Sequence, residues 1–210
     1  MQHGITSVMK LIINNRIKSC ISNFNSNYKN KITAMKKNIL VLISVALGLG
    51  SCAQQKTSLD LSTVKDFEIN RYLGKWYEIA RFDHRFEKGM VGTTAIYTLN
   101  DDKTIRVENS GYQDSFSGKF KTAIGKAKFA NKDNPAMLKV AFFLWFYGAY
   151  NVLELDQENY SYAMIGSNSD KYFWILSRTP KLEDKDLEFL LKRAKERGFD
   201  TSKIIWVGQK

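Results

Sequence analysis

The stretch that decides the fold is Tyr72-Leu73-Gly74-Lys75-Trp76-Tyr77-Glu78-Ile79-Ala80-Arg81-Phe82, taken together with Trp174-Ile175-Leu176-Ser177-Arg178-Thr179-Pro180. The first stretch contains a Gly-x-Trp motif where a strand begins, and the second carries an arginine where a strand ends. The same region of the chain holds three further informative stretches: Phe82-Asp83-His84-Arg85-Phe86-Glu87, Tyr150-Asn151-Val152-Leu153-Glu154-Leu155-Asp156, and Gly198-Phe199-Asp200 running into Lys203-Ile204-Ile205-Trp206-Val207.

A lone Gly-x-Trp motif would be weak evidence, but five stretches in this order resemble the lipocalins. The last three stretches resemble the bacterial branch of that family, the outer-membrane lipoproteins similar to apolipoprotein D, and the resemblance covers about Glu68 to the C-terminus. It implies that Trp76, two residues after Gly74, plugs the closed base of an eight-stranded barrel, with Arg178 lying across the indole face. Such a cation–π contact is worth about 0.5–2 kcal/mol, depending on desolvation.

Alternation of apolar and polar residues recurs at short intervals along the body of the chain, and turn residues separate the alternating segments, as in an antiparallel barrel. Closing such a sheet removes exposed strand edges. We therefore expect an all-β fold: an eight-stranded antiparallel up-and-down β-barrel, the lipocalin fold, with one C-terminal α-helix packed outside. The expected strands are residues 75–82, 93–99, 105–111, 119–130, 137–142, 150–155, 160–166 and 172–177.

The expected helix follows Pro180 and ends before Gly198, a residue suited to a helix C-terminus. Its apolar residues form one stripe at helical spacing, which should dock on the outer wall of the barrel. The stripe consists of Leu187, Leu190, Leu191 and Ala194. A short segment at 204–206 is then expected against the first strand.

The N-terminal region indicates export. Met35-Lys36-Lys37 precedes an apolar run that is too short to span a bilayer, which needs about 20 residues, and the pattern is typical of a signal peptide. Leu49-Gly50-Ser51-Cys52 resembles the lipobox of bacterial lipoproteins, which implies lipid attachment at Cys52; the alternative is a plain signal peptide that ends near a cysteine. The expected division is 1–34, a leader from a start codon chosen too early; 35–51, a lipoprotein signal peptide; 52–66, a flexible tether; and 67–210, the lipocalin domain.

The net charge of +11 does not indicate a nucleic-acid binder. Residues 1–51 hold seven Lys and Arg residues and no acid, so the remainder of the chain carries a net charge of only +4. A mild positive balance of this kind is compatible with many soluble domains. We therefore expect no nucleic-acid partner.

The residue types also argue against catalysis and against a bound cofactor. His84 is the one histidine after the signal, and the two cysteines, Cys20 and Cys52, both lie before the expected domain. The domain therefore has no thiol nucleophile and no disulfide, and no spacing of His, Cys and Asp resembles a metal site. We expect no enzyme activity, no metal and no cofactor.

Strand alternation predicts which side chains line the cup, because charged neighbours should face water. Glu78 should also face inward, which is costly unless it is paired or neutral, and the sequence does not identify its partner. The 83–92, 112–118, 143–149 and 167–171 loops should surround the open mouth. The predicted ligand-binding residues are Tyr97, Val107, Asn109, Ala127, Phe129, Val140, Phe142, Trp145, Asn151 and Leu153.

An aromatic run at Phe142-Phe143-Leu144-Trp145-Phe146-Tyr147 falls on the third of these loops. A loop cannot bury both of its faces unless something covers it, so an apolar ligand, a membrane surface or a second subunit is expected there. If half of the run points into the barrel, it belongs to the core instead.

An apolar cup with isolated polar groups fits a long aliphatic ligand that carries one or two hydrogen-bonding functions. The sequence therefore predicts a lipocalin anchored through Cys52 to the outer membrane, facing the periplasm, that binds or transports fatty acids, lysophospholipids or similar amphiphiles. The alternatives are an enzyme that acts on a lipid in the cup and a structural envelope protein that forms a homodimer through the aromatic loop.

Overall fold

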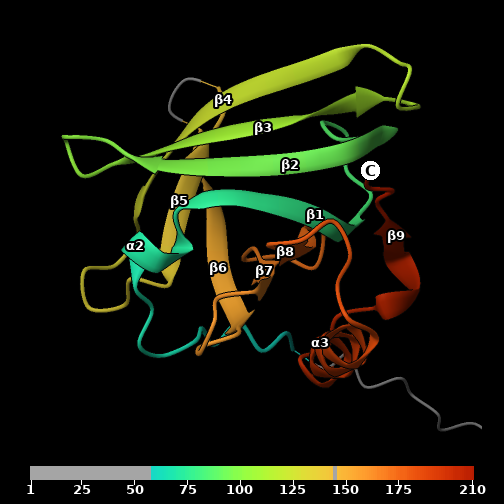
Figure 1. Ribbon diagram of the computed structural model, residues 1–210. Helices are drawn as coiled ribbons and strands as arrows, with labels where there is room; N and C mark the ends of the chain where they lie inside the picture. The colour runs from blue at the N-terminus through green and yellow to red at the C-terminus, as the bar shows by residue number, and fades with distance from the viewer. Residues whose placement is uncertain (1–57, 144–145) are drawn as a thin grey trace, which may run out of the picture. The chain divides into compact units, whose positions relative to one another are not determined.

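The computed structural model describes residues 58–143 and 146–210, and it shows one nine-stranded antiparallel sheet that closes into a barrel (Figure 1). Around the sheet, β1 pairs with β2 on one side and with β8 on the other, which completes the closure. The expected eight-stranded barrel with an outside C-terminal helix is confirmed. The elements are α2 (Ile69–Tyr72), β1 (Gly74–Phe82), β2 (Met90–Leu99), β3 (Ile105–Gln113), β4 (Phe120–Phe129), β5 (Met137–Ala141), β6 (Gly148–Leu155), β7 (Tyr162–Gly166), β8 (Phe173–Ser177), α3 (Asp184–Glu196), η1 (Thr201–Lys203) and β9 (Ile204–Trp206).

The closed base of the barrel is built around Trp76, which is fully buried. The Trp76 indole nitrogen donates to the Tyr72 carbonyl at 2.8 Å, at the end of α2, a short helix that sequence alternation did not predict. The Arg178 guanidinium carbon lies 3.8 Å from the centre of the Trp76 ring, and the same guanidinium donates to the carbonyls of Arg71 and Lys75 at 2.7 and 2.9 Å. Gly74, at φ 90°, adopts a backbone conformation that side chains disfavour, and it starts β1 under this guanidinium.

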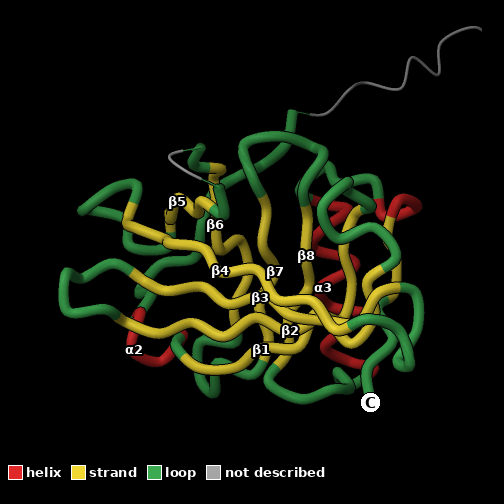
Figure 2. Tube along the Cα trace, turned by 90° about the horizontal axis from the view of Figure 1, so that it is seen from above, coloured by secondary structure: helices red, strands yellow, loops and turns green. Residues whose placement is uncertain are grey.

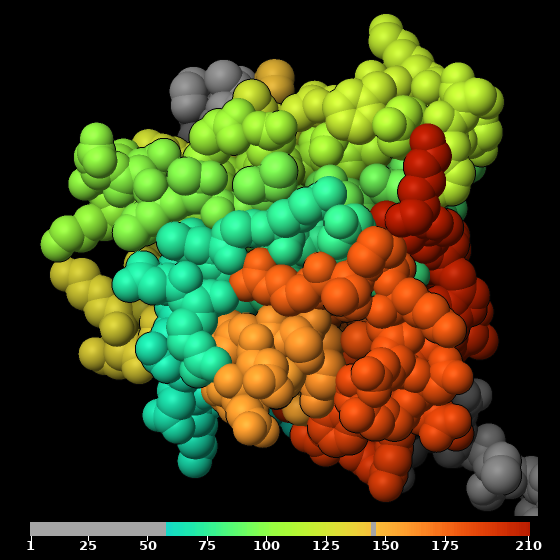
Figure 3. Space-filling model, viewed as in Figure 1, coloured from blue at the N-terminus to red at the C-terminus, as the bar shows by residue number. Residues whose placement is uncertain are grey.

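The core has two parts, one on each side of the barrel wall. Inside the barrel, apolar side chains pack around Trp76 toward the base. Outside, the stripe of α3 that includes Leu190 and Ala194 packs on the outer faces of β7 and β8 through Met164 and Ile175. Figures 1 and 2 both show α3 beside these two strands, and Figure 3 shows its atoms, in orange-red at the lower right, on the outer surface of that face. Within the described ranges, no helix is long and apolar enough to cross a membrane.

The segment that enters the domain is also fixed to this outer wall. The amide of Val64 donates to the carbonyl of Val152 at 3.0 Å, and Leu59 and Leu61 pack against the apolar cluster under α3. The expectation of a flexible tether over 52–66 is therefore wrong for residues 58–66, because spaced apolar residues hold that part to the barrel. Residues 52–57, including Cys52, lie outside the described residues, as do the expected leader and signal peptide.

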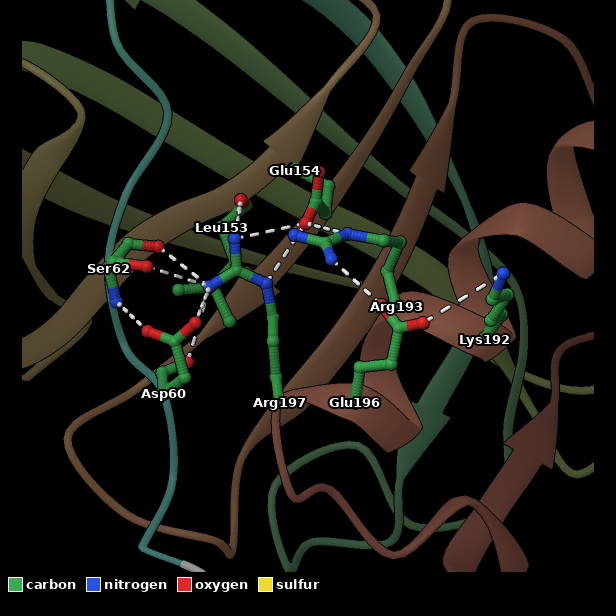
Figure 4. A network of polar contacts seen from close by, with 8 residues as sticks. All are labelled: Asp60, Ser62, Leu153, Glu154, Lys192, Arg193, Glu196 and Arg197. Atoms are coloured by element: carbon green, nitrogen blue, oxygen red, sulfur yellow. Dashed lines mark hydrogen bonds and ion pairs between the residues drawn. The ribbon is translucent and has the colours of Figure 1, made fainter.

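Arg197, at the end of α3, joins this segment to the barrel (Figure 4). Its guanidinium donates to the carbonyls of Ser62 and Leu153, each at 2.9 Å, and to the Glu154 carboxylate at 3.0 Å. Arg193 donates to the same carboxylate oxygen at 2.7 Å. These hydrogen bonds connect three separate parts of the chain: the segment before α2, strand β6 and the C-terminal end of α3.

Candidate ligand-binding cavity

A cavity of about 810 Å³ occupies the end of the barrel opposite Trp76. Its walls come mainly from β1 to β4, β6 and β8, and most of the side chains that line it are apolar or aromatic. Phe86, Phe146 and Asn168 line its outer part, which places three of the expected mouth loops around the opening. The fourth expected loop, at 112–118, contributes no lining residue among those described.

Half of the side chains predicted from alternation line the cavity. These are Tyr97, Val107, Asn109, Val140 and Phe142. Ala127 and Phe129 belong to the interior core but do not line the cavity. Trp145 lies outside the described residues.

The predictions for Asn151 and Leu153 were wrong. Leu153 packs outside the barrel in the cluster under α3, and Asn151 donates to Asn168 Oδ1 at 2.9 Å without lining the cavity. The pairing of β6 with β7 shifts register between Val152 and Glu154. An extra residue at such a bulge reverses the alternation, so both Leu153 and Glu154 face α3.

Three tyrosine hydroxyls form a chain toward the base of the cavity. Tyr150 shares hydrogen bonds with Tyr72 at 2.6 Å and with Tyr97 at 2.8 Å. Burial raises the pKa of each of the three phenols above its ordinary value, so all three keep their protons. Two bonds use two of the three hydroxyl protons. Because Tyr97 and Tyr150 line the cavity, this row of hydroxyl groups offers a ligand a polar contact at the inner end of the cavity.

A second polar group, here called the acidic wall, consists of Glu78, Arg81, His84, Glu87 and Trp174. Arg81 donates to Glu78 at 2.7 Å and is the buried partner that the sequence did not identify. Residues three apart on a regular strand face opposite sides, but the pairing of β1 with β8 shifts register between Glu78 and Ala80. The bulge places Arg81 on the same side as Glu78.

Glu87 completes the acidic wall from the turn after β1. Its carboxylate accepts a hydrogen bond from the Trp174 indole at 3.1 Å. His84 Nε2 lies 2.9 Å from the same oxygen but not in hydrogen-bonding geometry, and neither ring nitrogen has a partner among the described residues. The His84 ring is buried and stacks on Phe86 at 4.0 Å between centroids.

Arg81 donates to the carboxylate of Glu78 but only to the main-chain carbonyl of Glu87. Burial raises the pKa of Glu78 to about 8, and the neighbouring charge of Glu87 acts in the same direction, while Arg81 opposes both. Glu78 and Glu87 are 4% and 6% exposed, and both line the cavity. The cavity therefore carries a carboxyl group that retains its proton near neutral pH.

Two further polar atoms in the lining have no hydrogen-bond partner within the described part of the chain. They are Thr93 Oγ1 and Asn109 Oδ1. Thr93 is 3% exposed and lies beside Glu78, since the Gln209 amide donates to the carbonyls of both residues at 3.0 and 2.7 Å. Buried polar atoms usually find partners, so these two are unsatisfied groups in the wall of the cavity.

The rim of the mouth is aromatic. Phe143 and Phe146 are each 70% exposed and Phe86 is 61% exposed, and all three line the outer cavity. Phe142, on the same loop, reaches inward and is 39% exposed. The aromatic loop is thus divided between lining and open surface, and its open part is the kind of apolar patch that marks a binding surface.

The described residues hold no cluster of three or more His, Cys, Asp or Glu side chains that would bind a metal ion.

Known proteins resemble this chain over the same region. A model of the lipocalin-like domain family matches residues 67–209. The chain is 47% identical over 175 residues to the outer membrane lipoprotein Blc of Vibrio cholerae serotype O1, covering 83% of this chain and 99% of that protein. It is 32% identical over 183 residues to apolipoprotein D of Macaca fascicularis, covering 81% and 95%.

Among solved structures, insecticyanin from the tobacco hornworm Manduca sexta matches with a TM-score of 0.59 at 24% identity, over 73% of this chain and 87% of that one. At that identity the match speaks for the fold alone, and it agrees with the barrel seen here. Taken with the family model and the two relatives, it leads to one conclusion: this chain belongs to the lipocalin-like family.

Proposed function

We propose that this protein is a membrane-anchored lipocalin that binds and transports fatty acids, lysophospholipids or similar small hydrophobic ligands in the cell envelope. The observation that carries the proposal is the open cavity of about 810 Å³ with its largely apolar lining. Ligand cavities of about 300–1,000 Å³ with a few placed polar groups hold molecules of this size. The relative from Vibrio cholerae is named an outer membrane lipoprotein, which supports an envelope setting.

The expected affinity follows from the apolar area that the ligand buries. About ten methylenes at about 0.8 kcal/mol each give a gross gain of about 8 kcal/mol. Immobilising the ligand and desolvating its head group remove part of that gain. Contacts of the ligand with the rim and with the polar groups of the cavity must offset this loss for the affinity to reach about 1 μM.

Mass spectrometry of small molecules that co-purify with the native protein tests the ligand class. We expect lipids with one acyl chain, enriched over the same preparation of a variant whose cavity is filled, for example Ala95→Trp. Recovery of no lipid, or of equal lipid from both proteins, would contradict the proposal.

The membrane anchor is proposed at Cys52, whose position after Leu49-Gly50-Ser51 resembles a lipobox. Cys52→Ala should move the protein out of the membrane fraction, because the signal region offers no other thiol for the thioether. The expected place of the anchored protein is the periplasmic face of the outer membrane. Unchanged membrane association of the variant would contradict the anchor.

Dimer formation is a second candidate role for the rim, favoured by the 70% exposure of Phe143 and Phe146. Light scattering with and without lipid separates the two roles. A monomer in both states assigns the rim to ligand or membrane contact, whereas a dimer that persists without lipid assigns it to a second copy of the chain. We propose binding rather than catalysis in either case.

A further inference from the structure

We propose that the acidic wall, with the rings around it, is a head-group subsite that takes the cationic end of the bound amphiphile, an ammonium or trimethylammonium group. The inference rests on the proposed function, since the acyl chain would fill the apolar part of the same cavity. It adds a selection rule: at equal chain length, a cationic head group should be preferred over a carboxylate.

The first argument is the balance of charge in the cavity wall. Glu78 and Glu87 both line the cavity, and Arg81 is the one guanidinium that contacts them among the described residues. That guanidinium binds the Glu78 carboxylate but only the main-chain carbonyl of Glu87, at 2.8 Å. The Glu87 carboxylate therefore has the Trp174 indole as its one hydrogen-bond donor among the described residues, with His84 Nε2 at 2.9 Å outside hydrogen-bonding geometry. A buried carboxylate without a cation is unfavourable, and a cationic ligand would supply one.

The second argument is the kind of polar atom that lacks a partner. Of the unpaired buried atoms in the described residues, Thr93 Oγ1 and Asn109 Oδ1 belong to residues that line the cavity, and both can accept hydrogen bonds. A primary ammonium group brings N–H donors to such atoms, whereas a trimethylammonium group has no N–H and a ligand carboxylate brings only acceptors. Lys121 also lines the cavity, where its ammonium group donates to Gln113 Oε1 at 2.7 Å and forms no ion pair with Glu78 or Glu87 among the described residues.

The third argument is the aromatic surroundings of Glu87. The Tyr172 and Trp174 rings are nearly parallel, at 13° with centroids 6.0 Å apart, and Phe86 stacks with Tyr172 at 6.2 Å. All three rings line the cavity. Ring faces near a cation attract it through their quadrupole, and clustered rings beside a carboxylate suit quaternary ammonium groups.

The protonation of Glu78 agrees with a cationic ligand. Burial and the charge of Glu87 raise the pKa of Glu78 to about 8, so Glu78 keeps a proton near neutral pH because the wall has only one arginine for two carboxyl groups. A bound cation would take over the role of that proton.

The test compares three ligands with the same dodecyl-length chain on the complete chain carrying Cys52→Ser, after removal of endogenous lipid. The ligands are dodecyltrimethylammonium, dodecanoate and the uncharged monododecanoylglycerol, each titrated calorimetrically below its micelle concentration. We expect the cation to bind about tenfold more tightly than dodecanoate. Glu87→Gln should remove this preference, so that the ratio of the affinities for the cation and for dodecanoate falls to about one.

Glu188→Gln, an exposed acid on α3, removes the same charge away from the cavity and should change nothing. If dodecanoate binds as tightly as the cation, or if the preference survives Glu87→Gln, the subsite is refuted. The ligand comparison needs no variant, so it decides the question even if Glu87→Gln does not fold. Failure of all three ligands to bind would instead refute the proposed function itself.

Discussion

The closed base and the acidic wall are both built from aromatic and charged side chains, yet they differ in how completely their polar atoms are paired. At the base, the Trp76 indole and the Arg178 guanidinium direct hydrogen bonds to main-chain carbonyls. In the acidic wall, both His84 nitrogens and Arg81 Nε have no partner among the described residues.

This difference separates stability from binding. Unpaired buried polar groups cost free energy. The acidic wall therefore contributes less to the free energy of unfolding than the fully paired base does. His84 and Arg81 do not line the cavity, but Glu78, Glu87 and Trp174 of the same wall do, whereas Trp76 and Arg178 of the base do not. We infer that the base holds the barrel closed and that the open end recognises the ligand.

The largest expected effect is the loss of the indole at the base. Trp76→Ala should lower the free energy of unfolding by about 3–5 kcal/mol, the range for truncating a buried tryptophan. Urea unfolding followed by circular dichroism measures it. A loss below about 1 kcal/mol would mean that the base does not close the barrel.

A smaller loss is expected from the arginine above that indole. Arg178→Met keeps the aliphatic bulk but removes the cation–π contact and the hydrogen bonds to three main-chain carbonyls, so we expect a loss of about 1–3 kcal/mol. Arg106→Met is the matched control, since Arg106 pairs with Glu108 on the partly exposed outer face of the barrel at 2.6 Å and should contribute about 0–1 kcal/mol. Equal losses for the two variants would show that Arg178 is only a surface residue.

The acidic wall should reveal itself in the pH dependence of stability. The pKa of Glu78 rises from 4.5 to about 8 on folding, so between these values the unfolded chain has released a proton that the folded chain retains. Stability should therefore fall as pH rises through this window and level off above it. Glu78→Gln, which cannot titrate, should lack this fall in stability, whereas the wild type should show it. Parallel curves for the two proteins would contradict a raised pKa.

The smallest effect on stability is expected at the rim. Phe146→Ser should change the free energy of unfolding by no more than about 0.5 kcal/mol, as for other exposed positions, while weakening ligand binding. Phe189→Ser, at an exposed phenylalanine on α3, is the control and should leave binding unchanged. If both variants bind alike, the rim takes no part in recognition.

The sequence predicted the barrel because alternation and turn residues report directly on a half-buried strand, and the Gly-x-Trp and arginine motifs mark its two ends. The site was predicted only where alternation holds, as at Tyr97 and Val107. The bulges in β1 and β6 shift the alternation by one residue, and nothing in the local pattern marks them. The Glu78–Arg81 pair and the outward position of Leu153 were therefore beyond prediction from alternation.

Contacts between distant segments were equally hidden. Glu87 meets Trp174 only because the turn after β1 folds over β8, and the three tyrosine hydroxyls come from α2, β2 and β6. Neither arrangement has a sequence spacing that would identify it.

The central claim, that the open end of the barrel holds an acyl chain while the base is structural, is tested most directly by a chain-length series. Intrinsic tryptophan fluorescence is titrated with monoacylglycerols from eight to eighteen carbons. We predict that affinity rises by about three- to fourfold for each added methylene until the chain fills the cavity. An affinity that does not depend on chain length, or no binding by the delipidated protein, would contradict the claim.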